Sequence, residues 1–185
     1  MFAKTYSEAR EAFRAEATTA GGRLESIDVI EVEGHGMLTI DVAMFGEDHE
    51  RAVIVSSGLH GVEGFAGSAI QRQCIANGLP AGVRTVLIHG LNPYGMACSR
   101  RVNENNVDLN RNFYSKAEEF TGASDGYRML EPFLNPTTPH GGLELVVLRA
   151  MWLILRHGMP TLKQAVAGGQ YDFPKGVFFG GNELQ

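Results

Sequence analysis

One stretch constrains the fold of this chain more than any other, the run VIVSSGLHGVEG at residues 53–64. Residues 51–57 form a short β-branched apolar run bounded by polar residues and Gly58, which is typical of a central strand covered on both faces. Residues 64–77 then predict a helix. In open α/β sheets the functional crevice lies beyond the carboxyl ends of the strands, and His60 and Glu63 fall at such a place.

His60 and Glu63 are candidate metal ligands. An imidazole nitrogen and a carboxylate oxygen suit zinc, but catalytic zinc normally takes three protein ligands plus a water, so two do not complete a site. The alternative is a chance match. With 6 histidines and 15 glutamates in a chain of this length, the number of His-x-x-Glu pairs expected by chance is roughly one half. Glycines at positions 58, 61, 64 and 67 favour the interpretation as a metal site, since close backbone packing around an ion or ligand is a common reason for glycine.

The first half of the chain predicts an alternation of helices and strands. Residues 6–20 predict a helix with Ser7 as a possible N-cap. Residues 24–32 and 37–45 alternate in polarity and predict an antiparallel hairpin. Residues 84–89 predict a second short apolar strand, followed by a turn at 90–95.

The second half predicts fewer regular elements. Residues 143–157 are apolar nearly all round and predict a buried helix, too short and too interrupted by Arg149 to cross a membrane. Residues 161–167 predict a short helix, and 170–181 a glycine-rich loop with a short strand. We expect residues 1–185 to form a single domain, since ~100 to 200 residues per domain is usual.

Composition excludes some function classes. A formal charge of −5 argues against a nucleic-acid partner, because binding phosphates needs a basic face.

No signal peptide is visible at the start of the chain, so we expect a cytoplasmic protein with no membrane partner. Cys74 in a predicted helix and Cys98 in a loop are expected to be buried or free thiols rather than a disulfide.

A loop at residues 99–113 combines arginines with asparagines. Arg100, Arg101 and Arg111 stand among five asparagines, and guanidinium groups with neighbouring amides are suited to holding a carboxylate or a polarised carbonyl. The alternative is a loop whose polar side chains only satisfy backbone groups.

Four motifs follow one another along the chain: His60-Gly-Val-Glu63, Asn92-Pro-Tyr-Gly95, Arg101 and Val107-Asp-Leu-Asn-Arg-Asn-Phe113. In order and spacing, they together resemble the zinc carboxypeptidase family, including its succinylglutamate desuccinylase and aspartoacylase relatives, and are nearest to a poorly characterised bacterial branch. The resemblance implies an α/β fold with a mixed, mainly parallel sheet flanked by helices. It also implies a zinc-dependent hydrolase of peptide or amide bonds, releasing a C-terminal or acylated amino acid.

The resemblance assigns roles position by position. It makes His60 and Glu63 zinc ligands and makes Arg101 the group that polarises the scissile carbonyl, with Arg100 as the alternative if the alignment shifts by one. Asn110 and Arg111 would bind the free carboxylate of a small peptide or acylated amino acid.

The chain departs from the family in its later part. The family's third zinc ligand and general-base glutamate come from well downstream of the Asn-Arg pair. His140 in a loop and His157 at the end of a helix lack the setting expected of that ligand. We therefore expect a C-terminally incomplete, carboxypeptidase-like domain that holds zinc weakly and self-associates through a sheet edge or its C-terminal segment. The alternative function is a non-catalytic, truncated remnant with an incomplete metal site.

Overall fold

The computed structural model describes residues 2–46, 49–138 and 143–185. The chain divides into two compact units, Met1–Glu104 and Asn105–Gln185. The assignment of the whole chain to one domain therefore stays a prediction.

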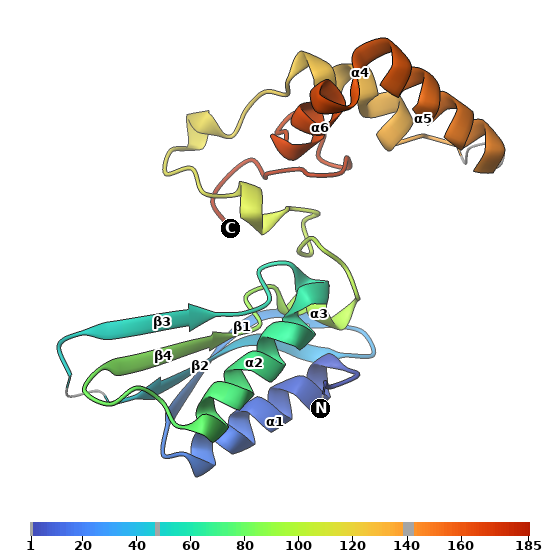
Figure 1. Cartoon of the computed structure of the whole chain (residues 1–185). Helices are drawn as coiled ribbons and strands as arrows, with labels where there is room; N and C mark the ends of the chain where they lie inside the picture. Colours follow the sequence, from blue (N-terminus) through green and yellow to red (C-terminus); the bar gives the residue numbers. More distant parts are fainter. Residues whose placement is uncertain (1, 47–48, 139–142) are drawn as a thin grey trace. The chain divides into compact units, whose positions relative to one another are not determined.

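The first unit is built on a four-stranded mixed sheet in the order β1-β2-β4-β3 (Figure 1). Its strands are β1 (Arg23–Val32), β2 (Gly36–Phe45), β3 (Ala52–Ser56) and β4 (Arg84–His89). The antiparallel β1–β2 hairpin confirms the prediction for this segment. The sheet is mixed as expected but not mainly parallel: β2 and β4 are also antiparallel, and only β3 and β4 run parallel. The hairpin supplies half of the strands, which is why antiparallel pairing dominates.

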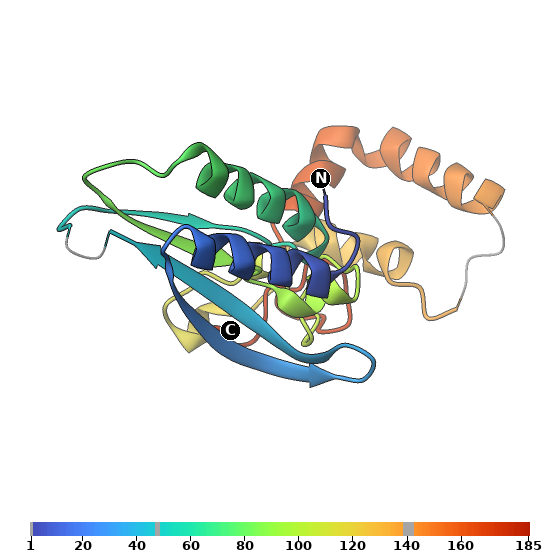
Figure 2. The same ribbon diagram turned by 90° about the horizontal axis from the view of Figure 1, so that it is seen from below.

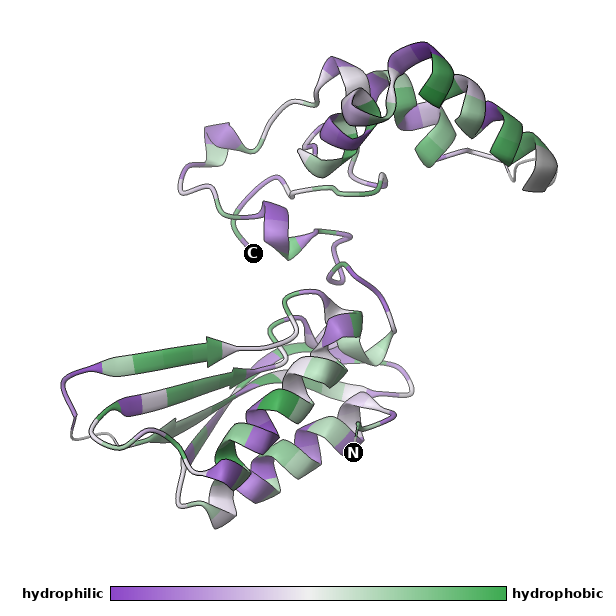
Figure 3. Ribbon diagram, in the orientation of Figure 1, coloured by the Kyte–Doolittle hydropathy of each residue, from purple (hydrophilic) through white to green (hydrophobic). Residues whose placement is uncertain are grey.

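Strand β3 does not occupy the predicted central position. It forms one edge of the sheet, pairs only with β4 among the described strands, and is exposed along its whole length. Val53, Ile54 and Val55 keep 43%, 66% and 36% of their surface exposed, so this strand leaves apolar surface uncovered in this unit (Figure 3). A β-branched run indicates a strand but does not specify its place in the sheet.

Two helices cover one face of this sheet, α1 (Tyr6–Thr19) and α2 (Gly64–Asn77), which lie side by side (Figures 1 and 2). The bounds of α2 confirm the prediction, and α1 differs at its start, where Thr5 rather than Ser7 is the N-cap and accepts from the backbone N–H of Glu8. Phe13 of α1 and Leu87 of β4 are fully buried in the core between helices and sheet. Burying such a side chain contributes about 1.5–3 kcal/mol each.

A polar cluster is buried beneath α1. Asp41 on β2 is fully buried, and Arg10 donates to it from Nε at 2.7 Å while Arg14 donates from a terminal nitrogen at 2.5 Å. On the neighbouring strand His89 is also fully buried; its ring stacks on Phe13, with centroids 4.5 Å apart. The two arginines neutralise the Asp41 carboxylate, which would otherwise be costly to bury.

Acid is expected to destabilise this unit through His89. Burial lowers the pKa of His89 from 6.5 to about 4; the Asp41 charge opposes this shift, and the charges of Arg10 and Arg72 add to it. Because the folded pKa lies below the unfolded one, this contribution to stability is fully present above pH 6.5 and is lost as the pH falls toward 4. The expected loss at pH 4 is about 3 kcal/mol in the free energy of unfolding. Urea unfolding at a series of pH values measures it.

A His89→Gln variant provides the control for that experiment. Glutamine does not titrate, so the free energy of unfolding of the variant should fall less steeply between pH 6.5 and 4 than that of the parent. Equal slopes for the two proteins would show that His89 is not the group responsible.

The second unit is helical. It contains the 3₁₀ turns η2 (Leu109–Arg111) and η3 (Ala117–Glu119) and the helices α4 (Asp125–Leu134), α5 (Leu143–His157) and α6 (Met159–Ala167). Its core joins the last three helices through Leu130, Leu153 and Ala165. Helix α5 has the predicted bounds, α6 begins two residues earlier than predicted, and α4 was not predicted.

Helix α5 is not buried as predicted. The side chains of Leu145, Leu148, Trp152 and Leu155 are 55–84% exposed within the structure, whereas Leu153 is buried. No single helix of the described residues is long and apolar enough to cross a membrane; α5 and α6 meet the length and composition only jointly, as a pair bent by 103°.

The C-terminal segment is held by isolated backbone bridges and side-chain hydrogen bonds rather than by a regular strand. The short strand predicted within 170–181 is reduced to isolated bridges of Gln170 with Ala123 and Phe179. Gln170 is fully buried, donates from Nε2 to the Phe173 carbonyl at 2.8 Å and accepts from the Phe173 N–H at 2.7 Å. The Tyr127 hydroxyl donates to the Val177 carbonyl at 2.7 Å.

Candidate functional site

The candidate site begins where the parallel strands β3 and β4 end together. Beyond the strands the pairing continues through the loops, because the N–H of Leu91 donates to Ser57 O and that of Asn92 to Gly58 O, each at 2.9 Å. Gly58 has φ +71°, a left-handed conformation that glycine adopts without a steric cost. The loop after β3 is thereby fixed against the loop after β4.

Two glycines bring the loops into direct backbone contact. A Cβ added to Gly61 would lie 2.0 Å from the carbonyl carbon of Gly95, so only glycine fits at position 61. Two bonds hold this approach: Gly61 N–H donates to Arg101 O at 3.3 Å, and Val62 N–H to Arg100 O at 3.1 Å. The turn η1 (Gly61–Glu63) is therefore anchored to the segment that carries both arginines.

Asn92 is a positioning residue to which the sequence analysis gave no role. Its side chain is buried, accepts from Gly95 N–H at 2.7 Å and donates to Arg101 O at 3.2 Å. It is the N-cap of α3 (Pro93–Ala97), a short helix that stands where the sequence predicted a turn. The signal was present in the sequence, since Asn followed by Pro is a favourable start of a helix.

Three predicted site residues come together on this frame. His60 Nδ1 lies 3.2 Å from Glu63 Oε1, and a terminal nitrogen of Arg101 lies 4.0 Å from the same oxygen. The His60 side chain is only 12% exposed, whereas those of Glu63 and Arg101 are 65% and 40% exposed. The site thus has a mostly buried imidazole, with a carboxylate and a cation reaching solvent.

The donor atoms of His60 and Glu63 fit two corners of a zinc site. Tetrahedral zinc, with bonds of ~2.0–2.2 Å, places neighbouring ligand atoms ~3.3 Å apart, close to the 3.2 Å found here. The same distance suits a hydrogen bond between imidazole and carboxylate. Among residues 2–46, 49–138 and 143–185, no three His, Cys, Asp or Glu residues gather in a way that could hold a metal ion.

The remaining predicted residues of the first unit have simpler settings. Arg100 is exposed and contributes its backbone, accepting from Val62 and donating its N–H to Gly95 O at 2.7 Å. Cys74 is exposed and Cys98 half-buried, and both are free thiols as expected. His140 lies outside the described residues, and His157 ends α5 with its ring 6.4 Å from that of Trp152.

Asn110 and Arg111 belong to the second unit, where buried Asp108 begins η2. Asp108 Oδ1 accepts from the Asn110 N–H at 3.1 Å, so an aspartate two residues earlier fixes the backbone of the predicted pair. Asn110 is exposed and Arg111 half-buried. Asp108 was also missed, although an Asp-x-Asn sequence is a signal for this kind of capped turn.

Two asparagines of the loop at residues 99–113 donate hydrogen bonds to backbone carbonyls. Asn106 donates to the carbonyls of Pro174 and Gly176, and Asn112 donates to those of Gly180 and Glu183. These bonds tie the C-terminal segment of the second unit to the segment that carries Arg111. Asn106 and Asn112 therefore have the backbone-binding role that the second alternative gave to this loop, whereas the roles of Arg101, Asn110 and Arg111 stay predictions.

The model of a family described as "Protein of unknown function (DUF2817)" matches residues 2–185. None of the curated proteins matches this chain.

Solved structures that resemble this one include two glutaminyl cyclases and a third protein, thrombin-activatable fibrinolysis inhibitor. The bovine inhibitor, in complex with tick carboxypeptidase inhibitor, is 17% identical with a TM-score of 0.45, over 84% of this chain and 57% of its own. The cyclase of Fimbriiglobus ruber is 16% identical with a TM-score of 0.34, over 45% of this chain and 36% of its own. That of Porphyromonas gingivalis is 11% identical with a TM-score of 0.31, over 74% and 55%. The chain thus spans about a third to a little over half of the lengths of these proteins.

Proposed function

The chain belongs to the DUF2817 family, and we propose that it is a zinc-dependent hydrolase of peptide or amide bonds. One observation carries the proposal: His60 Nδ1 and Glu63 Oε1 lie 3.2 Å apart beyond the parallel strands, with the Arg101 guanidinium 4.0 Å from Glu63. Motif order and spacing, resembling those of zinc carboxypeptidases, support it. The carboxypeptidase-like fold is part of the same proposal.

Each residue has a defined role in the proposed reaction. His60 and Glu63 would hold the metal, which when bound polarises the amide carbonyl and lowers the pKa of an attacking water. Arg101 provides a fixed positive charge beside the ligands, where negative charge develops on the carbonyl oxygen. The resemblance assigns to Asn110 and Arg111, in the second unit, the binding of a free carboxylate on a small peptide or acylated amino acid. A third metal ligand and a general base are required in addition to these residues.

A hydrolysis assay on the full chain tests the proposal. With equimolar zinc, the protein is expected to release an amino acid from an N-acyl amino acid or a dipeptide, and to release much less from the same compound with its carboxylate amidated. A chelator should abolish the release. A folded, zinc-loaded chain that hydrolyses neither compound would contradict the proposal.

The second candidate is a non-catalytic remnant of the fold with a two-ligand metal site. It is favoured by the finding that the described residues bring together no three potential ligands. Such a protein would bind zinc weakly and hydrolyse nothing. The same assay, combined with a zinc titration, distinguishes it from the enzyme.

Zinc affinity is expected to depend on His60. Loss of one of two ligands removes a large part of the coordination energy, so His60→Ala should weaken zinc binding at least about tenfold. Competition with a chromophoric chelator measures the affinity. His35→Ala is the matched control, because His35 is exposed in the turn between β1 and β2 and should leave the affinity unchanged. Equal zinc affinity in the His60 variant and the parent would refute the assignment.

A further inference from the structure

A pocket of about 830 Å³ lies within the second unit, where α4 and α6 pack together. Its walls are residues 121–124, the first turn of α4, one side of α6, and Gly168, Gly169 and Tyr171 after that helix. All of these residues belong to this unit. The volume is in the range usual for small-molecule sites.

Close contacts fix the walls of this pocket. Gly126 of α4 packs directly on Ala165 of α6, because an added Cβ would lie 2.8 Å from the Ala165 Cβ. Tyr171 N–H donates to Gly122 O at 2.8 Å, and Gly122 N–H donates to Asp172 Oδ1 at 2.9 Å. These two bonds join the segment before α4 to the segment after α6. The pocket is therefore preformed, as ligand sites usually are.

The lining of the pocket carries no charge. Although 20% of the residues in the chain are charged, none of the described residues that line this pocket is Asp, Glu, Lys, Arg or His. A carboxylate, phosphate or ammonium group would lose hydration there without gaining a counter-charge. The aliphatic lining is limited to alanine and proline, so a lipid or another purely apolar ligand would gain little. This lining favours a ligand that is polar and uncharged.

Thr161 and Gln164 offer hydrogen-bonding groups to such a ligand. They lie three residues apart on the same side of α6, and both are exposed. Within the described part of the chain, neither side chain is hydrogen-bonded to another residue. A hydroxyl both donates and accepts, and an amide has two donors and an acceptor. The pair therefore matches a ligand whose own hydroxyls donate and accept.

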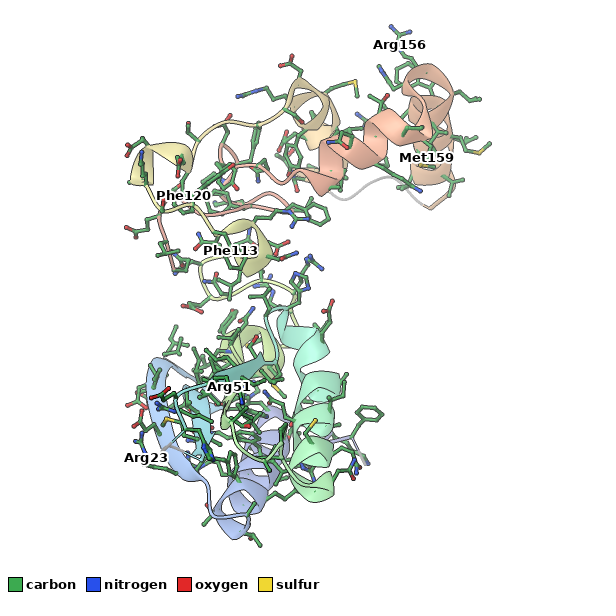
Figure 4. All side chains as sticks on the ribbon, turned by 60° about the vertical axis from the view of Figure 1, so that its left-hand side comes forward. Arg23, Arg51, Phe113, Phe120, Arg156 and Met159 are labelled. Atoms are coloured by element: carbon green, nitrogen blue, oxygen red, sulfur yellow. The ribbon has the colours of Figure 1, made fainter. Side chains whose placement is uncertain are left out.

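Tyr171 gives the pocket an aromatic wall in a fixed position. Its hydroxyl donates to Arg111 O at 2.8 Å, and its ring packs edge-on against that of buried Phe120, with centroids 6.0 Å apart (Figure 4). Burial raises the pKa of Tyr171 to about 12, so this wall also stays uncharged near neutral pH. The body of a tyrosine is apolar, which suits the C–H face of a sugar ring.

We propose that this pocket binds a neutral carbohydrate the size of roughly one or two sugar units, with its hydroxyls on Thr161 and Gln164 and a ring face on Tyr171. The ligand is bound without being cleaved, because glycoside hydrolysis uses a pair of carboxylates and none lines the described pocket. This binding function is separate from the proposed hydrolase, since no residue of the proposed zinc site and neither member of the Asn110–Arg111 pair lines the pocket.

Binding of sugars by the full chain in the presence of EDTA tests the pocket without zinc or turnover. The neutral probes are cellobiose and the methyl glycosides of glucose, galactose, mannose and N-acetylglucosamine, measured by ligand-observed NMR. Methyl glucuronide and methyl glucosaminide place a negative or a positive charge on the glucose ring. At least one neutral sugar is expected to bind at least about tenfold more tightly than both charged glycosides, because a charge loses hydration in this pocket. N-acetyl-alanine amide, a neutral compound that is not a sugar, should bind no better than the charged glycosides.

Substitutions on α6 locate the binding. Thr161→Val and Gln164→Ala each remove a hydrogen-bonding group from an exposed position, and each should weaken sugar binding about threefold or more. Lys163→Ala is the matched control, because Lys163 lies between them on the same helix, is exposed and does not line this pocket. Tyr171→Leu should also weaken binding, whereas Tyr171→Phe retains the ring and should preserve most of it.

The outcomes are decisive for the pocket and leave the hydrolase to its own assay. Preferential binding of a neutral sugar that is weakened in Thr161→Val and Gln164→Ala but not in Lys163→Ala supports the proposal. It is overturned if no neutral sugar binds, if the charged glycosides or N-acetyl-alanine amide bind as tightly, or if binding is unchanged in both variants. Thermal melts of every variant exclude unfolding as the cause of lost binding.

Discussion

Gly61→Ala is expected to disrupt the candidate site and to destabilise the first unit by about 3 kcal/mol or more in the free energy of unfolding. The added Cβ would lie 2.0 Å from Gly95 C and 2.3 Å from Gly95 Cα, and these are backbone atoms that cannot move aside alone. The two loops would have to separate, weakening the bonds from Gly61 and Val62 to the carbonyls of Arg101 and Arg100. Urea unfolding measures the loss, and zinc affinity and hydrolysis measure the damage to the site.

Gly168→Ala is the matched control for this variant. A Cβ on Gly168 would meet its nearest neighbour, Gln164 O, at an ordinary 3.5 Å, and its φ of −68° suits any residue. This change should leave the free energy of unfolding within about 0.5 kcal/mol of the parent. If the two alanine variants lose similar stability, close packing of Gly61 against Gly95 is not what fixes the loops.

Local elements of the first unit could be predicted from the sequence because each has a local cause. The hairpin β1–β2 follows from alternating polarity, and α2 follows from the segment between the glycine-rich loop and Gly78. The β3–β4 pairing is parallel, as expected for strands joined by a helix. These features depend on neighbours in the sequence, and the structure confirms them.

Burial could not be predicted in the same way, because it depends on distant partners. Strand β3 and helix α5 both have the apolar composition of buried elements, yet Ile54 and Leu148 keep 66% and 62% of their surface exposed. An apolar sequence pattern predicts that a segment forms a strand or a helix, but not which other parts of the fold will cover it. Self-association through a sheet edge stays a prediction, and the exposed apolar edge of the first unit is β3 rather than a C-terminal strand.

The site could be predicted as far as its motifs extend. His60, Glu63 and Arg101 lie close together, because the segments that follow the neighbouring parallel strands β3 and β4 leave the sheet at the same end. Their roles stay predictions. The positioning contacts of Asn92 and Asp108 were missed, since buried polar side chains show their partners only in three dimensions.

Arg101→Ala is expected to lower kcat by about 10²- to 10³-fold with little change in KM, because stabilisation of a developing oxyanion is realised in the transition state. The substrate is an acylated amino acid with a free carboxylate, and the assay is steady-state hydrolysis at saturating zinc. Zinc affinity is measured in parallel, since Arg101 lies 4.0 Å from Glu63 Oε1 and its removal changes the charge beside a proposed ligand. At saturating zinc, a change in zinc affinity does not alter the measured kcat, so the two effects of the substitution are separated.

Arg100→Ala is the matched control, and it also tests the alternative alignment. Arg100 is the adjacent residue, carries the same charge and is exposed, while its contacts to Val62 and Gly95 are made by backbone atoms that alanine retains. Its removal should therefore change kcat by less than about threefold, as expected of a surface side chain that acts only through screened charge. A larger loss of kcat in Arg100→Ala than in Arg101→Ala would transfer the oxyanion role to Arg100. A loss confined to KM in Arg101→Ala would instead make Arg101 a substrate-binding group, because uniform binding acts on KM alone.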